Sequence, residues 1–209
     1  MTLIREGDVV LFQGDSITDC QRIRENTEDL GRGYAMMAAA WFSAKYPELG
    51  VRFINRGIGG NRVKDLALRW QEDCIDLKPS FVSILIGIND VWRRYDSNDP
   101  TSADDYEASY RDILNRARQA CNPRFILLEP FVLPHPEDRM SWRADLDPKI
   151  HVVRRLAREF NAILVPLDGI FAQAAAICEP SFWSRDGVHP TPAGHALIAQ
   201  SWLRAVKAL

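Results

Sequence analysis

The chain has 209 residues, of which 46% are hydrophobic and 26% are charged, and its formal net charge is -2. This composition predicts one globular domain over residues 1–209 and excludes a disordered or fibrous chain. The charge is nearly balanced and no block of Lys and Arg occurs. The usual electrostatic reason to expect a nucleic acid or an anionic membrane as partner is therefore absent.

The first residues, 1–12, lack the basic segment and long apolar segment that are typical of a secretory signal. We therefore expect a cytoplasmic location. No membrane partner is expected, because the longest strongly apolar run, residues 81–88, is far too short to cross a bilayer. The cysteines show no C-x-x-C pair or zinc-finger spacing, so we expect reduced, mostly buried thiols and no metal site. They are Cys20, Cys74, Cys121 and Cys178.

Short runs typical of β-strands alternate with segments of helical period along the chain. The predicted strands cover residues 9–12, 51–54, 81–86, 125–128 and 163–165. The third and fourth runs lack polar alternation, as expected for strands that are covered on both faces of a parallel sheet. The pattern predicts the α/β class: a three-layer α/β/α sandwich around a five-stranded, parallel, doubly wound sheet of the flavodoxin-like type.

Apolar stripes on the intervening helices would cover this sheet. The stripes are Tyr34, Met37, Trp41 and Ala44; Tyr106, Tyr110, Ile113 and Ala117; Ile150, Val153, Ala157 and Phe160; and Ile198, Trp202 and Ala205. Two helices also have start signals. Thr191 followed by Pro192 predicts the beginning of the last helix, and residues 102–105 resemble a capping box.

Ligands of doubly wound sheets bind beyond the carboxyl ends of the strands. Three candidate segments follow predicted strands: residues 14–19 (GDSITD), 55–61 (NRGIGGN) and 87–90 (GIND). The first places the Ser16 hydroxyl at this edge, the second lets a backbone approach a ligand closely, and the third adds the neutral amide of Asn89. Taken alone, the first and third segments are better explained as turns.

Near the end of the chain, Asp186 precedes His189 by three residues in a predicted loop. An aspartate so placed can accept the second N–H of the imidazole and fix its orientation. Together with the strand-end segments, this pair supplies a nucleophile, a base, an orienting carboxylate and oxyanion donors. The combination predicts nucleophilic catalysis at Ser16.

These segments resemble the four conserved blocks of the SGNH (GDSL-type) hydrolase superfamily, in the same order and over nearly the whole chain. The longer strings GDSITD, GINDVWR at residues 87–93 and VHP at residues 188–190 are similar to those of bacterial intracellular acetylxylan esterases. The resemblance implies an α/β/α fold. It also implies a serine esterase that hydrolyses O-acetyl esters of xylo-oligosaccharides or related sugars through an acyl-enzyme, without a cofactor.

The resemblance assigns the catalytic triad to Ser16, Asp186 and His189. It assigns the oxyanion donors to the N–H of Ser16, the N–H of Gly60 and the side-chain amide of Asn89. Gly59 stays an alternative to Gly60, which is favoured because Asn61 matches the polar position after the glycine of the family.

Other side chains near the blocks are candidates for binding the substrate, although ordinary packing or surface ion pairs explain each of them equally well. They are Asp15, Arg56, Arg62, Trp92, Arg93, Tyr95 and Trp183. The remaining histidines have no partner pattern and receive no role. They are His135, His151 and His195.

Two other functions remain open. A thioesterase or lysophospholipase of the same superfamily would use the same machinery, and a flavodoxin-like module would bind a ligand without catalysis. The expected partner is a small acetylated saccharide. The position of the acetyl group and the oligomeric state, a homo-oligomer included, are not fixed by the sequence.

Overall fold

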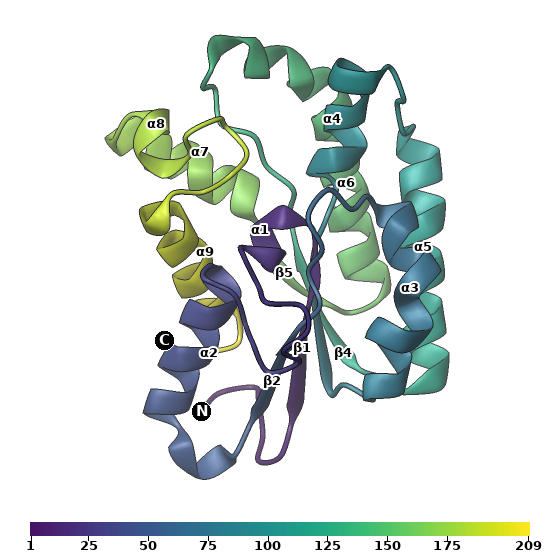
Figure 1. Cartoon of the computed structure of the whole chain (residues 1–209), viewed down its shortest axis with the longest axis vertical. Helices are drawn as coiled ribbons and strands as arrows, with labels where there is room; N and C mark the ends of the chain where they lie inside the picture. Colours follow the sequence, from purple (N-terminus) through teal and green to yellow (C-terminus); the bar gives the residue numbers. More distant parts are fainter.

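The computed structural model describes residues 1–209 and contains a five-stranded parallel sheet between two layers of helices (Figure 1). The strands are β1 (Val9–Gly14), β2 (Arg52–Asn55), β3 (Phe81–Leu85), β4 (Arg124–Leu128) and β5 (Ile163–Val165). Their spatial order, β2-β1-β3-β4-β5, is the flavodoxin-like order. The predicted fold class and all five predicted strands are confirmed.

Helices α2, α7 and α9 cover one face of the sheet, and α3, α5 and α6 cover the other (Figure 1). The α-helices are α1 (Ser16–Asp19), α2 (Tyr34–Lys45), α3 (Val63–Asp73), α4 (Ile88–Ser97), α5 (Ala103–Ala120), α6 (Arg143–Glu159), α7 (Leu167–Ile177), α8 (Pro180–Trp183) and α9 (Pro192–Ala205). Short 3-10 segments are η1 (Pro47–Leu49), η2 (Ile75–Leu77) and η3 (Glu137–Trp142). No helix is both long enough and apolar enough to span a membrane.

Two apolar clusters form the core, one on each face of the sheet. The predicted stripes on α5 and α6 lie in these clusters and are buried, which confirms them. In α9, Ile198 and Trp202 are fully buried, and the Trp202 indole donates to Ser83 Oγ in β3 at 3.0 Å. The predicted helix starts are also confirmed: Thr191 Oγ1 accepts the N–H of Gly194 at 3.3 Å, and Ser102 Oγ accepts that of Asp105 at 3.0 Å.

The stripe predicted on α2 is wrong in part. Tyr34 is buried, but Trp41 is 52% exposed and Ala44 is exposed as well. The side chains that α2 buries are Tyr34, Ala35, Ala38, Ala39 and Phe42. Because this helix is apolar on nearly all sides, its periodicity could not select the face that meets the sheet.

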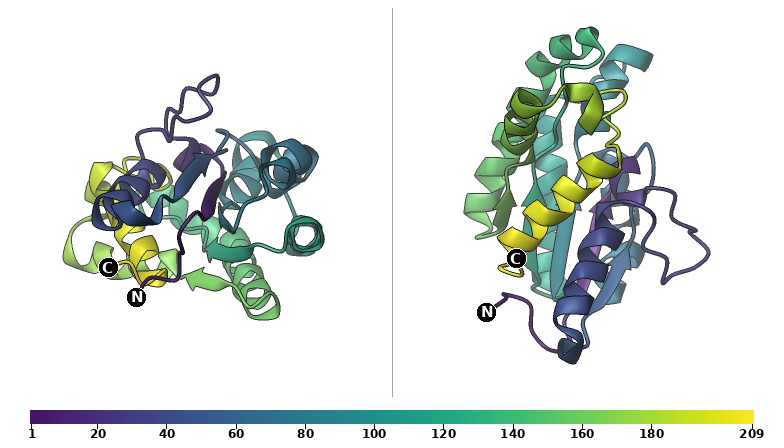
Figure 2. Two further views of the ribbon diagram at one scale, coloured as in Figure 1. Left: turned by 90° about the horizontal axis from the view of Figure 1, so that it is seen from below. Right: turned by 90° about the vertical axis from the view of Figure 1, so that its left-hand side faces the viewer.

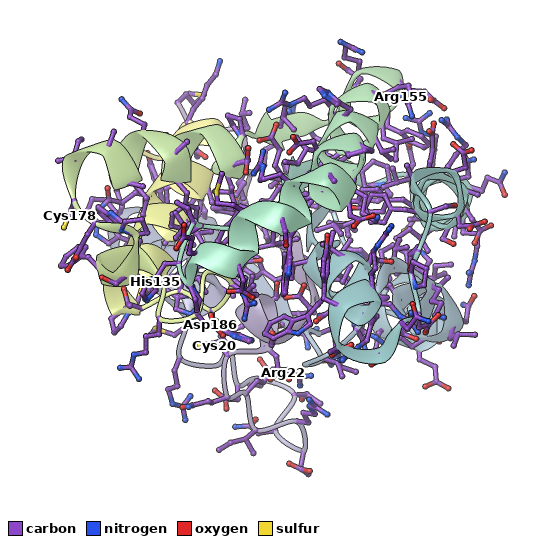
Figure 3. The ribbon with its side chains drawn as sticks, turned by 90° about the horizontal axis from the view of Figure 1, so that it is seen from above. Cys20, Arg22, His135, Arg155, Cys178 and Asp186 are labelled. Carbon is purple, nitrogen blue, oxygen red and sulfur yellow. The ribbon has the colours of Figure 1, made fainter.

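The carboxyl ends of the strands define one edge of the molecule, and α1 and α4 begin there. Viewed from above this edge, Asp186 and Cys20 lie near the middle of the molecule, whereas Arg155 and Cys178 lie at its periphery (Figure 3). The segment of residues 20–33, between α1 and α2, projects from the body of the molecule (Figure 2). Residues from the beginning and the end of the chain therefore meet at this edge.

Candidate active site

Ser16 stands at the junction between β1 and α1. A Cβ on Gly14 would lie 2.3 Å from both the Leu85 carbonyl oxygen and Thr18 Oγ1, so this close approach needs a glycine. Asp15 then caps α1, because its Oδ1 accepts the N–H of Ile17 at 2.9 Å. Ser16 is the first residue of the helix, and its N–H has no partner within the helix. The motif thus presents a hydroxyl and a free N–H together.

The structure brings the predicted nucleophile, base and orienting carboxylate into one line of hydrogen bonds. Ser16 Oγ lies 2.9 Å from His189 Nε2, across 173 positions of sequence. His189 Nδ1 lies 2.7 Å from Asp186 Oδ2. A carboxylate can only accept, so Nδ1 donates to it, and Nε2 is left to accept the Ser16 proton. This arrangement suits removal of a proton from a serine hydroxyl.

A tight loop holds Asp186 and His189 in this relation. Asp186 Oδ1 accepts the N–H of His189 at 2.7 Å and that of Val188 at 3.0 Å. Gly187 has φ +84°, and a Cβ there would lie 2.4 Å from the His135 carbonyl oxygen, so only glycine suits this turn. The spacing of three residues therefore lets one carboxylate bind both the backbone and the ring of His189.

The electrostatics of the pair favour an ionised Asp186 and a basic His189. Partial burial raises the pKa of the Asp186 carboxyl, but the hydrogen bonds from the ring and N–H of His189 and from the N–H of Val188 outweigh it and hold this pKa well below its usual range. The hydrogen bond to Asp186 raises the pKa of His189 despite partial desolvation, and the charge of Asp15 adds to the effect.

Of the two candidate glycines, Gly60 has the free N–H. The Gly59 N–H donates to Asp19 Oδ2 at 2.9 Å, whereas that of Gly60 donates to no acceptor of the protein. Asp19 is only 7% exposed and also binds Arg24 at 2.7 Å, so it is fixed in place. The geometry therefore favours Gly60 as the oxyanion donor, and Asp19 is a supporting residue to which the sequence analysis gave no role.

Asn89 lies in the first turn of α4 and is 5% exposed. Its Nδ2 donates to the carbonyl oxygen of Asn61 at 3.0 Å. An amide nitrogen carries two hydrogens, so one remains for a ligand. The side chain is thereby tied to the loop that contains Gly60.

Two buried carboxyls lie at the starts of α1 and α4. Asp15 and Asp90 are each 1% exposed, and each has one carboxyl oxygen without a partner. Burial raises the pKa of Asp15 to about 7, although the N–H of Ile17 and the charge of His189 act against it. Burial likewise raises the pKa of Asp90 to about 7. Asp15, a predicted substrate contact, lies in the interior, where it caps α1.

Trp92 and Arg93 are the predicted substrate residues that lie beside the triad and the oxyanion loop. The Trp92 ring centroid lies 5.8 Å from that of His189. A Cβ built on Gly60 would lie 3.7 Å from Arg93 Nη2, and Arg93 also pairs with Asp96. Both side chains are partly exposed.

Tyr95 and Trp183 are engaged elsewhere. The Tyr95 ring stacks on Trp142 with centroids 5.1 Å apart, and its hydroxyl donates to Asp145 Oδ2 at 2.9 Å. The Trp183 indole donates to the carbonyl oxygen of Ala174 at 3.2 Å, at the end of α7. The structure does not bring either ring into contact with Ser16 or His189.

The two predicted arginines after β2 are likewise paired. Arg62 Nη1 donates to Asp99 Oδ2 at 2.7 Å. Arg56 Nη1 donates to the carbonyl oxygen of Asn55 at 3.1 Å, and its Nε lies 3.6 Å from Asp73. Neither guanidinium is bonded to a residue of the triad.

A contact that the sequence did not indicate adjoins the nucleophile. His195 Nδ1 accepts the N–H of Tyr34 at 3.2 Å, and its Nε2 lies 3.4 Å from Cys20 Sγ. Burial lowers the pKa of His195 to about 4, so this imidazole stays neutral. Cys20 and His195 are 175 positions apart, and no local spacing relates them.

A cavity of about 330 Å³ opens at Ser16 and His189. Its lining residues are Ser16, Ile17, Asp19, Cys20, Gln21, His189, Pro190 and His195. Six of the eight lining residues have polar side chains. The volume is near the lower end of the range for ligand cavities, so the cavity suits a compact ligand.

Comparison with known proteins agrees with this geometry. The model of the GDSL-like Lipase/Acylhydrolase family matches residues 12–197. The chain belongs to this family. It is 40% identical over 212 residues to an acetylxylan esterase of Geobacillus stearothermophilus, covering 97% of this chain and 95% of that protein. The chain is thus an esterase of the GDSL/SGNH family, a carboxylic ester hydrolase close to an acetylxylan esterase.

Solved structures of related proteins share the whole fold. A Parabacteroides merdae protein described as a GDSL-like lipase has a TM-score of 0.94 and 35% identity, with all of both chains covered. An α/β hydrolase from the metagenome of Lake Arreo has a TM-score of 0.92 and 33% identity, covering 100% of this chain and 99% of that one. The Geobacillus esterase superposes with a TM-score of 0.88 and 38% identity, covering 99% and 96%.

The structures of the Geobacillus esterase include variants described as catalytic mutants. In these, a serine, an aspartate or a histidine is replaced by alanine. The replaced aspartate and histidine stand three positions apart, as Asp186 and His189 do here. The residue types and their spacing are consistent with the line of hydrogen bonds described above.

Proposed function

We propose that the protein removes acetyl groups from xylo-oligosaccharides or related small sugars, through a covalent acetyl-enzyme. The hydrogen-bonded line from Ser16 through His189 to Asp186 carries this proposal. Membership of the family and the 40% identity to an acetylxylan esterase support acetyl esters of sugars as the substrates.

In the first half-reaction, Ser16 Oγ attacks the carbonyl carbon of the acetyl ester and His189 Nε2 takes its proton. Asp186 stabilises the resulting imidazolium. The negative charge on the carbonyl oxygen is met by the N–H groups of Ser16 and Gly60 and by the Asn89 amide. Each such donor contributes about 10²–10³ in kcat.

The tetrahedral intermediate then collapses. The bond between the carbonyl carbon and the sugar oxygen breaks, and His189 gives its proton to the departing alcohol. In the second half-reaction, water loses a proton to His189 and attacks the acetyl carbon. Ser16 recovers a proton as it leaves, and acetate is released.

The cavity beside Ser16 favours a short acyl group over a fatty-acyl chain. Of its lining residues, the hydrophobic ones are Ile17 and Pro190. A long alkyl chain needs a continuous apolar surface to leave water, whereas a methyl group does not. This observation favours an acetylesterase over a lysophospholipase.

Trp92 is the best placed side chain to contact the sugar. Its partly exposed ring lies beside His189, which must give a proton to the departing sugar oxygen. An indole face packs well on a sugar ring. Arg93, near the Gly60 loop, would donate to sugar hydroxyls.

The test measures kcat/KM for hydrolysis of two sets of substrates. The first set contains acetylated xylo-oligosaccharides, other acetylated sugars and acyl thioesters. The second contains acetyl, butyryl and octanoyl esters of one alcohol. We expect the acetylated xylo-oligosaccharides to give the highest kcat/KM. Each methylene that does not fit should lower kcat/KM by roughly 10-fold. A higher kcat/KM for octanoyl esters or thioesters would contradict the proposal.

A further inference from the structure

We propose that Asp90 is a positioning residue that fixes the distance between two oxyanion donors, the Gly60 N–H and the Asn89 amide. The inference rests on the proposed function. Asp90 follows Asn89 in the first turn of α4, and its Oδ2 accepts the N–H of Val63 at 3.1 Å. Val63 is the first residue of α3, directly after the loop that contains Gly60. The bond therefore joins the helix that presents one donor to the loop that presents another.

This bond has a parallel partner. Asn89 Nδ2 donates to the carbonyl oxygen of Asn61 at 3.0 Å, so consecutive residues of α4 hold the segment 61–63 at two points. Gly60 immediately precedes this segment. A shift of α4 relative to α3 would change the distance between the Gly60 N–H and the Asn89 amide. Stabilisation of an oxyanion falls steeply when its donors leave hydrogen-bonding distance.

The acceptor that α3 supplies for its own start, Asp65, does not reach the N–H of Val63. Within the helix, Asp65 Oδ2 accepts the N–H of Arg62 at 2.8 Å. The Val63 N–H, by contrast, is one of the first-turn donors that find no acceptor inside a helix. Asp90 thus makes a link between two elements rather than a cap within one.

Asp90 is buried, and one of its two carboxyl oxygens has no hydrogen-bond partner. It is 1% exposed, and the oxygen without a partner is Oδ1. The buried Lys149 of α6 lies nearby, but its ammonium donates to the Thr101 carbonyl oxygen at 2.8 Å and not to Asp90. Burying a carboxyl with an unsatisfied oxygen costs stability. Buried carboxyls of this kind gather at functional sites.

One pair of variants removes the bond without changing Asp90. Val63→Pro deletes the N–H at a helix position where proline is tolerated, and Arg62 before it already has the extended conformation (φ -100°, ψ 172°) that proline requires. Val63→Ala keeps the N–H and removes only the packing of this buried side chain. We expect Val63→Pro to lower kcat about 10–10²-fold below Val63→Ala, with KM for an acetyl ester nearly unchanged.

A second set changes the carboxyl. Asp90→Ala should lower kcat by about 10²-fold, whereas Asp90→Asn, which can still accept the Val63 N–H, should stay within about 10-fold of the parent. Glu129→Ala is the matched control for Asp90→Ala. Glu129 follows β4, is fully buried, binds Arg154 through Oε1 at 2.6 Å and has Oε2 without a partner.

The readouts are kcat, KM, the rate of inactivation by an organophosphonate, and the melting temperature. We expect kcat and the inactivation rate to fall together in Val63→Pro and Asp90→Ala but not in Glu129→Ala, whatever the loss of melting temperature. Equal kcat in Val63→Pro and Val63→Ala would overturn the inference. So would an equal loss of kcat in Glu129→Ala and Asp90→Ala. A parent protein that hydrolyses no acetyl ester would instead reject the proposed function.

Discussion

The two sides of Ser16 are built in different ways. On one side, His189 and Asp186 stand in a loop with side chains that are 45% and 36% exposed, and the two side chains bind each other. On the other side, Asn89 and Asp90 are 5% and 1% exposed. They lie in the first turn of α4, which follows the buried strand β3.

The difference follows from what each side must do. A general base has to pass protons between the nucleophile, the departing alcohol and water, so it needs access to solvent. Oxyanion donors act by being in place before the charge develops, so they need rigid support. A solvated loop serves the first need, and helix starts at the ends of buried strands serve the second.

The largest effect should come from the exposed side. His189→Ala removes the base, and we expect kcat for an acetyl ester to fall by about 10⁴–10⁶-fold. The melting temperature should change little, because the side chain is half exposed. His151→Ala, on the exposed face of α6, is the control and should keep full activity. Comparable kcat in His189→Ala and the parent would place the base elsewhere.

Asp186→Asn tests the partner of the base. We expect kcat to fall by roughly 10⁴-fold, because the imidazole loses its orientation and its counter-charge. The pKa of His189 should also fall, since the hydrogen bond to Asp186 is what raises it. The acid limb of kcat/KM should lie above pH ~6.5 in the parent and move to lower pH in the variant. An acid limb that does not move would show that Asp186 does not set the basicity of His189.

The buried side should give a smaller loss. Asn89→Ala removes one of the proposed donors, and we expect kcat to fall by about 10²–10³-fold with little change in KM. Ser97→Ala, at the exposed far end of the same helix, controls for effects on α4. A rise in KM at constant kcat would mean that Asn89 binds the substrate and does not stabilise an oxyanion.

The smallest effect concerns stability. Burial raises the pKa of Asp15 from 3.8 to about 7, so the folded state keeps a proton that the unfolded chain releases. Stability should therefore fall as the pH rises through this range. Asp15→Asn keeps the cap acceptor and cannot ionise, so the melting temperature should fall less between pH ~4 and ~7 than in the parent. An identical fall in both proteins would show that folding does not raise the pKa of Asp15.

Local patterns in the sequence predicted much of the site. Alternation along the chain placed three of the four motifs at strand ends, and parallel strands end at a common edge. The spacing of Asp186 and His189 predicted their hydrogen bond, because a loop of that length can be closed by one carboxylate. Cap signals at Ser102 and Thr191 predicted the starts of two helices for the same reason: both ends of the interaction lie within one turn.

Features that depend on distant packing were not predictable. The bond from Gly59 to Asp19 decides between two neighbouring glycines, yet it spans 40 positions. The contact between His195 and Cys20 forms only when α9 packs on α2, which brings His195 to the end of α1. The contact of Trp183 with α7 likewise depends on where α8 lies. The buried face of α2 was missed because its apolar residues surround the helix.

Labelling with an organophosphate tests the central claim most directly, because the adduct marks the hydroxyl that the base activates. Intact-mass and peptide analysis should find one adduct in the parent, on Ser16, and a rate of labelling at least about 10²-fold lower in His189→Ala. An adduct on another residue, or equal rates of labelling in the two proteins, would contradict the account.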